Sequence, residues 1–195
     1  MALKNQFTTA DYIDWNEAMN LVRRLYRDKN YRMSLFVGCG CFFGLRYSDL
    51  SRLTWGQLLS EEKMVVFEQK TGKRREIRIN KGFQRHIKDC KDALEVVDLS
   101  EPCFISRAGS IYTIQAMNRN LKLIKSRYGL HLNNFSTHSL RKTFGRRVVE
   151  MAGADSEMAL IRLSEIFQHS SVMITRRYLG LRQQELGEIY NCLQF

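Results

Sequence analysis

The stretch "IFQHSSVMITRRYLG" (residues 166–180) consists of two apolar helical pieces separated by a polar "HSS". Ser170 or Ser171 can cap the second piece, because a serine hydroxyl accepts a hydrogen bond from the free N–H groups at a helix start. His169 then precedes a short helix and Tyr178 lies near its end. In one continuous helix these two side chains would point to opposite sides. The break at the serines allows both to reach one place, so the stretch predicts a histidine and a tyrosine at a shared site.

The composition is that of a single folded domain with a basic surface. The chain has 195 residues, of which 44% are apolar and 11% aromatic, so it can bury a substantial core and disorder is excluded. Lys and Arg number 31 against 20 Asp and Glu, which gives a net charge of +11. This excess favours a polyanionic partner, and nucleic acid is the first candidate.

Cysteine usage and hydropathy favour a soluble cytoplasmic protein. The chain has five cysteines, an odd number, and no Cys-x-x-Cys pair. Two of them, Cys39 and Cys41, are too closely spaced and too isolated to form a zinc site, so we interpret all five as reduced thiols. No apolar run reaches the roughly 20 residues of a membrane span. The first residues lack the apolar core of a signal peptide.

Apolar periodicity predicts a mainly helical α+β fold with one small antiparallel sheet. Thr8 or Thr9 is expected to cap a first helix that begins at about residue 10. The nearly wholly apolar run "RMSLFVGCGCFFG" predicts a buried helix that ends at Gly44. "KMVVFEQ" and "RREIRIN" flank the turn "KTGK" and predict a β-hairpin. Further helices are expected at about 83–98, 113–128, 139–151, 157–168 and 172–179, with a tail helix over about 181–195.

Three other segments carry residues that suit chemistry on an anion. "GLRYSDL" places Arg46 just after the buried helix, with Asp49 three residues on. "THSLRKTF" places His138 and Arg141 three residues apart, on one helix face. Lys70 lies at the lip of the predicted hairpin, where a long side chain can reach the same place. Each pair taken alone is typical of an ordinary surface or capping pair, so the argument depends on their combination.

Together with His169 and Tyr178, these residues form an anion site that contains a nucleophile. Guanidinium groups bind phosphate oxygens in a bidentate manner and stabilise the charge of a pentavalent phosphorane. Nearby cations are expected to lower the pKa of Tyr178 by favouring the phenolate, and a histidine can accept its proton. A lysine can protonate the leaving alkoxide. No Asp/Glu cluster suited to Mg²⁺ stands out, so we expect neither a metal nor another cofactor.

In order and local wording, this pattern resembles the catalytic domain of the tyrosine recombinases, which include phage-type integrases. The resemblance extends from about residue 8 to 190 and is carried by Arg46, Lys70, His138, Arg141, His169 and Tyr178. One departure is Gln168, which stands where the family usually has a glycine before the histidine. The resemblance implies a site-specific recombinase or integrase that cleaves and rejoins DNA without a metal.

The resemblance also implies a role for each residue of the pattern. Tyr178 would attack the scissile phosphate to form a 3′-phosphotyrosyl link, while Arg46 and Arg141 hold its non-bridging oxygens. Lys70 would protonate the leaving 5′-oxygen, although it could instead contact only the DNA backbone. His138 would help to move the proton of the tyrosine, and His169 would donate a hydrogen bond to the phosphate. Phosphate contacts by other basic residues are expected at Lys73, Arg74, Arg75, Arg176 and Arg177.

Several expectations concern assembly. By resemblance, the partner is double-stranded DNA, on which a homotetramer forms from monomers, with possible accessory DNA-bending proteins. We expect residues 1–195 to be one catalytic domain without the N-terminal core-binding domain of most family members, either a fragment or a natural short form. The tail over about 181–195 could dock in cis or exchange between subunits. Two alternatives stay open: a type IB topoisomerase, which nicks and reseals, and a non-catalytic DNA-binding protein of the same fold.

Overall fold

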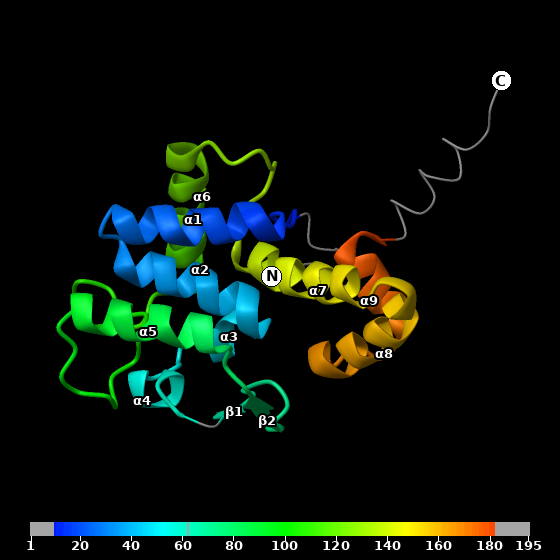
Figure 1. Cartoon of the computed structure of the whole chain (residues 1–195), viewed down its shortest axis with the longest axis horizontal. Coiled ribbons are helices and arrows are strands. Elements are labelled where there is room, and N and C mark those ends of the chain that lie inside the picture. The colour runs from blue at the N-terminus through cyan, green and yellow to red at the C-terminus, as the bar shows by residue number, and fades with distance from the viewer. Residues whose placement is uncertain (1–9, 62, 182–195) are drawn as a thin grey trace.

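The computed structural model describes residues 10–61 and 63–181, and most of them lie in helices (Figure 1). The longer helices are α1 (Trp15–Arg27), α2 (Tyr31–Phe43), α5 (Lys81–Ala93), α6 (Ile114–Tyr128), α7 (Thr137–Ala152), α8 (Ser156–Phe167) and α9 (Val172–Leu179). The shorter elements are α3 (Tyr47–Leu50), α4 (Trp55–Leu58), the 3-10 turn η1 (Gly153–Asp155) and the strands β1 (Met64–Phe67) and β2 (Arg74–Ile77). The predicted α+β class, mainly helical with one small antiparallel sheet, is confirmed.

Helix α2 is the centre of the fold, with α1, α5 and α7 packed around it (Figure 1). It is buried almost along its whole length, as its apolar sequence predicts. It ends at Gly44 in the left-handed conformation, with φ of 55°. A Cβ at Gly44 would lie 2.3 Å from the Phe144 ring of α7, so only glycine fits this turn. The turn leads the chain directly to Arg46 at the start of α3.

The N-terminal cap was predicted at the wrong residue. Helix α1 begins at Trp15, and the side chain of Asp14 accepts hydrogen bonds from the main-chain N–H groups of Asn16 and Glu17. A carboxylate at this position satisfies two free donors and also interacts favourably with the positive end of the helix dipole. Thr8 and Thr9, which were expected to cap the helix, lie outside the described residues.

The predicted hairpin is present and forms the lower edge of the molecule in Figure 1. Strands β1 and β2 pair antiparallel, with Met64 opposite Ile77 and Phe67 opposite Arg74. Met64 is fully buried and Phe67 is 65% exposed, so only one side of this short sheet reaches the core. The turn between the strands carries Lys70 and is closed at Gly72, which has φ of 67°.

Helices α7, α8 and α9 form a second apolar cluster on the right of Figure 1. The cap of α9 is Ser171, whose hydroxyl accepts from the N–H of Ile174, as one of the two serines was predicted to do. Close packing depends on Gly145 of α7, where a Cβ would lie 2.6 Å from Leu179 and 3.1 Å from the Phe167 ring. A glycine at this point therefore lets the helix that carries Tyr178 approach α7.

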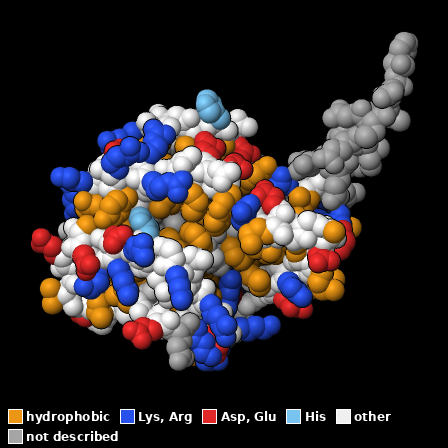
Figure 2. Space-filling model, in the orientation of Figure 1, with side chains coloured by type: hydrophobic (Ala, Val, Ile, Leu, Met, Phe, Trp, Pro, Cys, Tyr) orange, Lys and Arg blue, Asp and Glu red, His pale blue; other side chains and the backbone are white. Residues whose placement is uncertain are grey.

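None of the described helices has both the length and the apolar character needed to cross a membrane. The predicted tail helix over about 181–195 lies beyond Leu181, the last described residue, and it stays a prediction. The described cysteines, Cys39, Cys41, Cys90 and Cys103, are buried free thiols. Figure 2 shows Lys and Arg side chains over much of the visible face, including the lower edge where the hairpin lies.

Candidate active site

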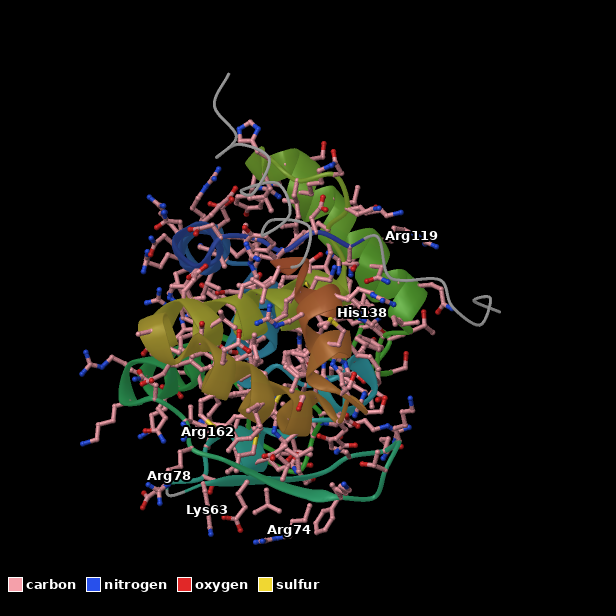
Figure 3. All side chains as sticks on the ribbon, turned by 90° about the vertical axis from the view of Figure 1, so that its right-hand side faces the viewer. Lys63, Arg74, Arg78, Arg119, His138 and Arg162 are labelled. Carbon is pink, nitrogen blue, oxygen red and sulfur yellow. The ribbon has the colours of Figure 1, made fainter. Side chains whose placement is uncertain are left out.

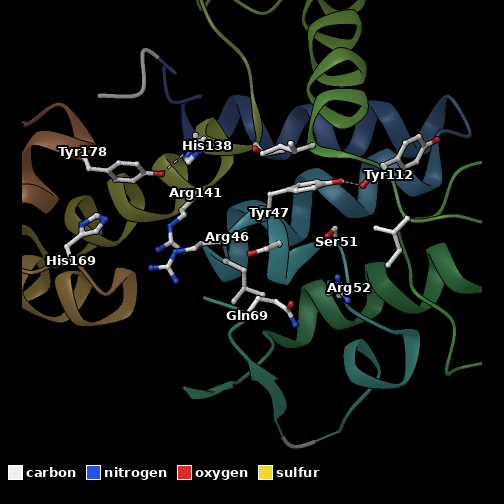
Figure 4. Close-up of a pocket in the computed structure, with 15 residues that line it drawn as sticks. Arg46, Tyr47, Ser51, Arg52, Gln69, Tyr112, His138, Arg141, His169 and Tyr178 are labelled. Carbon is white, nitrogen blue, oxygen red and sulfur yellow. Dashed lines mark hydrogen bonds between the residues drawn. The ribbon is translucent and has the colours of Figure 1, made fainter. Parts of the chain in front are cut away.

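Most residues of the predicted site, although they come from distant parts of the sequence, meet at one cleft of about 650 Å³ (Figure 4). The cleft lies between α3, the start of α7 and the connection from α8 to α9. Its lining includes five of the predicted site residues, namely Arg46, His138, Arg141, His169 and Tyr178. The structure therefore brings together the histidine and tyrosine of the 166–180 stretch, as the break at the serines predicts.

Two arginines share one hydrogen-bond acceptor at the base of the cleft. Nη2 of Arg46 and Nη2 of Arg141 donate to the main-chain oxygen of Phe167, over 2.8 and 3.2 Å. Phe167 is the last residue of α8, where free carbonyl groups carry the negative end of the helix dipole. This acceptor offsets part of the repulsion between two adjacent cations. It also holds their remaining N–H groups in fixed directions for an anion.

Arg141 is the more buried of the two, with only 5% of its surface exposed. Its Nη1 donates to the main-chain oxygen of Gly44, and its guanidinium lies 4.3 Å from the centre of the Phe167 ring. Burial lowers the pKa of Arg141 to about 10, so the group keeps its charge at neutral pH. A fixed cation with little access to water stabilises negative charge more strongly than a solvated one.

His169 is held by a buried threonine on the following helix. Its Nδ1 lies 2.9 Å from the hydroxyl of Thr175, a residue with no exposed surface. Burial, followed by the charges of Arg141, Arg46 and Lys70, lowers the pKa of His169 to about 4. The ring is therefore neutral at pH 7. It can supply a hydrogen bond to a phosphate rather than a full positive charge.

The cations near Tyr178 act on its pKa in the expected direction, but the net shift is upward rather than downward. Burial raises the pKa of Tyr178 to about 12, and the opposing effects of Arg141 and Arg46 are smaller. The hydroxyl donates to the main-chain oxygen of His138 at 3.5 Å, the outer limit of a hydrogen bond. Its ring lies against those of His169 and Phe167, at centroid distances of 5.4 and 5.6 Å. Tyr178 thus lies in the cleft with its hydroxyl protonated at neutral pH.

His138 lies at the start of α7 and faces the cleft (Figure 4). Its ring centre is 6.5 Å from that of Tyr178. Partial burial, followed by the charges of Arg141 and Lys142, lowers the pKa of His138 below its ordinary value. A neutral imidazole at this position has the protonation state that a proton acceptor requires.

Lys70 does not line the cleft itself. It is exposed at the tip of the hairpin and forms no hydrogen bond or ion pair with the described residues. Its charge contributes to lowering the pKa of His169, so the two side chains share one electrostatic environment. An exposed cation on a short turn can move toward a phosphate in the cleft with little loss of packing.

The five expected DNA contacts lie in different environments. Lys73 and Arg74 are exposed on the hairpin, where Arg74 also pairs with Glu76. Arg75 turns inward, and its Nη2 donates to the main-chain oxygen of Phe43 over 2.7 Å, which favours an internal role over a phosphate contact. On α9, Arg177 is exposed and Arg176 pairs with Glu157 of α8. In Figure 3, Arg119 lies above His138 and Arg74 lies at the lower edge of the molecule.

Sequence reasoning missed the buried groups that hold these side chains. Glu68 is 2% exposed and pairs with Arg46 over 2.7 Å. Asp49 was noted only for its spacing from Arg46, yet it is buried and accepts from the N–H of Gln69 at 2.8 Å. Thr175 was also missed, and its hydroxyl is hydrogen-bonded to the ring of His169. The only sequence signal for Glu68 was an acidic residue in an otherwise apolar strand.

Gln168 ends α8 in the left-handed conformation with φ of 54°, a region in which glycine is the usual residue. Its side-chain amide donates to Glu68 over 2.7 Å. The departure from glycine at this position thus introduces a new hydrogen bond to the hairpin. No group of three or more potential metal ligands occurs among the residues that the structure describes.

Comparison with known proteins shows the family to which this chain belongs. Residues 12–185 match the family model described as "Phage integrase family". The chain is 29% identical over 175 residues to the probable integrase/recombinase YoeC of Bacillus subtilis strain 168, a match that covers 89% of this chain and 91% of YoeC. It is 26% identical over 149 residues to the tyrosine recombinase XerC of Xanthomonas axonopodis pv. citri, and this match covers 76% of the chain and 46% of XerC.

The fold is also similar to solved structures. The crystal structure of XerA recombinase superposes with a TM-score of 0.72 at 21% identity, covering 98% of this chain and 68% of XerA. XerH, in a post-cleavage complex with its difH substrate, gives a TM-score of 0.67 at 18% identity, with 95% of this chain and 54% of XerH covered. These likenesses concern the fold alone.

The chain belongs to the phage integrase family. It is a site-specific recombinase or integrase of the tyrosine recombinase type, the class of enzyme that cleaves and rejoins DNA.

Proposed function

We propose that this recombinase acts on double-stranded DNA through a covalent 3′-phosphotyrosyl intermediate at Tyr178, within a homotetramer that assembles on the DNA. The observation that carries the proposal is the shared cleft, in which Tyr178 lies beside Arg46, Arg141 and His169. A phosphodiester that entered this cleft would meet two guanidinium groups and a neutral histidine before it reached the nucleophile. Arginine is the side chain best suited to the two non-bridging oxygens.

The chemistry follows from these positions. The Tyr178 oxygen attacks phosphorus, a P–Oη bond forms and the bond to the 5′-oxygen breaks. Negative charge gathers on the non-bridging oxygens, where Arg46 and Arg141 stabilise it. The tyrosine proton leaves to a base, for which neutral His138 is suited, and Lys70 protonates the departing 5′-oxygen. A 5′-hydroxyl of another strand reverses the steps, so the phosphoester bond is conserved.

The pKa of Tyr178 determines when its hydroxyl loses the proton in this proposal. Burial raises the pKa of Tyr178 to about 12, so its hydroxyl is protonated at neutral pH. The attacking oxygen therefore loses its proton during the reaction rather than before it. His138 supports this order, because burial and neighbouring charges lower its pKa and leave a neutral ring that can accept the proton.

The match to the phage integrase family favours recombination over the topoisomerase alternative. A lambda integrase dimer of similar fold was crystallised bound to a COC′ core site, which supports DNA as the partner. The tetramer, the DNA-bending accessory proteins and the exchange of the tail stay predictions for this chain.

The test is to accumulate and identify the covalent adduct between the protein and DNA. Duplexes with a randomised core and a nick next to each candidate cleavage position are mixed with the protein and then denatured. A cleaved strand loses a short 5′-hydroxyl fragment and cannot be rejoined, so reacted DNA stays attached to protein and can be sequenced. Mass analysis is expected to place the adduct on Tyr178. Tyr178→Phe should give no adduct, whereas Tyr12→Phe, outside the cleft, should react normally. An adduct on another residue would overturn the assignment, and no adduct at all would favour the binding-protein alternative.

A further inference from the structure

We propose that Glu68 is a positioning residue that ties Arg46 to the turn carrying Lys70, so that the two cations reach the scissile phosphate in one fixed arrangement. The inference rests on the proposed function and concerns how its site is assembled. It begins from a carboxylate that the reaction itself does not use. Glu68 is 2% exposed, and a carboxylate is almost never so buried unless it is paired.

The side chain of Glu68 joins two other segments of the site. Its Oε2 accepts from Nη1 of Arg46 at 2.7 Å and from the amide of Gln168 at 2.7 Å. Its Oε1 lies 3.8 Å from Nη1 of Arg75, a mostly buried guanidinium. One oxygen therefore contacts both the arginine at the start of α3 and the residue directly before His169.

The main chain of Glu68 closes the turn that carries Lys70. Its N–H donates to the oxygen of Lys73 at 3.0 Å, and its own oxygen accepts from the N–H groups of Thr71 and Gly72, at 3.3 and 2.7 Å. Lys70 lies inside this ring of hydrogen bonds. A displacement of Glu68 consequently moves the base of the turn, and with it the origin of the Lys70 side chain.

The two halves of this residue thus have different partners: the carboxylate positions Arg46, and the backbone positions the turn of Lys70. The positive charge around Glu68 explains why Arg46 and the turn of Lys70 are held rigidly relative to each other. Arg46, Arg75 and Arg141 bring three guanidinium groups into a small volume, and Glu68 is the buried carboxylate that contacts two of them. Removal of its charge leaves those cations with less compensation, and they must then separate.

The experiment compares Glu68→Gln with Arg46→Ala and Lys70→Ala on three versions of the nicked duplex that accumulates the covalent adduct. The first is unmodified. In the second a sulfur replaces the bridging 5′-oxygen, so that the leaving group needs no proton and Lys70 becomes dispensable. In the third a methyl group replaces one non-bridging oxygen, so that less charge develops and Arg46 becomes less important. Cleavage rates are measured in single turnover at saturating protein.

We expect Glu68→Gln to slow cleavage of the unmodified duplex by about 10–100-fold, the usual effect of a residue that orients a functional group. Because both cations are displaced, each modified duplex should restore only part of the rate. Lys70→Ala should be restored mainly by sulfur and Arg46→Ala mainly by the methyl group. Glu76→Gln, a carboxylate of the same hairpin that pairs at the surface with Lys63 and Arg74, should stay within about twofold of the unmutated protein.

Glu68→Asp tests the same idea with the charge retained, because the shorter side chain draws the carboxylate away from Arg46. It should show the same partial restoration by both duplexes, which keeps the test valid if Glu68→Gln fails to fold. Complete restoration by one duplex alone, equal loss on all three, or an unchanged rate would each overturn the proposal. If the unmutated protein forms no adduct, the proposed function fails instead, so the two failures are distinguishable.

Discussion

Arg46 and Arg141 donate hydrogen bonds to the same atom, the main-chain oxygen of Phe167 at the end of α8. The two residues are far apart in the sequence: Arg46 directly precedes α3, and Arg141 lies in α7. The shared acceptor fixes the spacing of their guanidinium groups through contacts within the protein alone. A site organised in this way does not need to reorganise its charges during the reaction, which is the basis of electrostatic catalysis.

Arg141→Lys is expected to reduce cleavage by about 10²–10³-fold, the usual effect of losing one preorganised donor to an oxyanion. A single ammonium cannot donate to Gly44 and Phe167 and also reach a phosphate with the geometry of a guanidinium. The measurement is the single-turnover rate of adduct formation. The matched control is Arg162→Lys on the exposed face of α8, and equal rates for the two variants would contradict the role of Arg141.

Tyr178→Phe is expected to abolish cleavage while DNA affinity changes by less than about twofold, since affinity depends mainly on contacts to the phosphate backbone. The hydrogen bond of the hydroxyl to the main-chain oxygen of His138 is long, at 3.5 Å, and the ring contacts remain. The midpoint of thermal unfolding should therefore stay close to that of the unmutated protein. Cleavage that persisted in this variant would identify another nucleophile.

Tyr178 and Arg141 of one chain line the same cleft, so each subunit is expected to supply its own nucleophile. A mixture of Tyr178→Phe and Arg141→Lys chains should then cleave no faster than the sum of the two alone. The comparison uses the nicked duplex at fixed total protein. Recovery of activity in the mixture would show that the tyrosine acts on the site of a neighbouring subunit.

The unfolding free energy is expected to fall as the pH decreases from about 6.5 to 4. In the folded state burial and neighbouring cations hold the pKa of His169 at about 4, whereas an unfolded histidine titrates near 6.5. Between these values the unfolded chain binds more protons, so acid favours unfolding. Urea titrations at pH 7 and 5 should show a smaller pH effect for His169→Gln than for the unmutated protein. An identical effect would contradict the lowered pKa.

Gly145→Ala is expected to destabilise the fold by about 1–3 kcal/mol and to slow cleavage. The new methyl group would lie 2.6 Å from Leu179 and 3.1 Å from Phe167, so α8 and α9 must move away from α7. This displacement shifts Tyr178, which precedes Leu179 on the same helix. Urea unfolding and adduct formation are the two measurements, and an unchanged rate with lower stability would show that the shift does not reach the nucleophile.

The elements of the fold were largely predictable because their signals are local. The apolar run of α2, the left-handed Gly44 that ends it, the alternating hairpin and the serine cap of α9 each arise from neighbouring residues. The first cap was not predictable with the same success, because Thr8, Thr9 and Asp14 all suit a helix start. In the structure Asp14 is the cap, and Ile13 before it is buried with its main-chain N–H donating to the hydroxyl of Thr143 in α7.

The sequence by itself determined the chemical types and the order of the candidate site residues, because both are properties of the chain. Only the tertiary structure decided the protonation of Tyr178 and His169 and the partners of Arg46. Burial raises the pKa of Tyr178 although arginines stand beside it, and burial depends on how α7, α8 and α9 pack. The acidic residue at the end of an apolar run was the one local signal for Glu68, and it did not show its partners: the hairpin, Arg46 and Gln168 converge on Glu68 only in the folded chain.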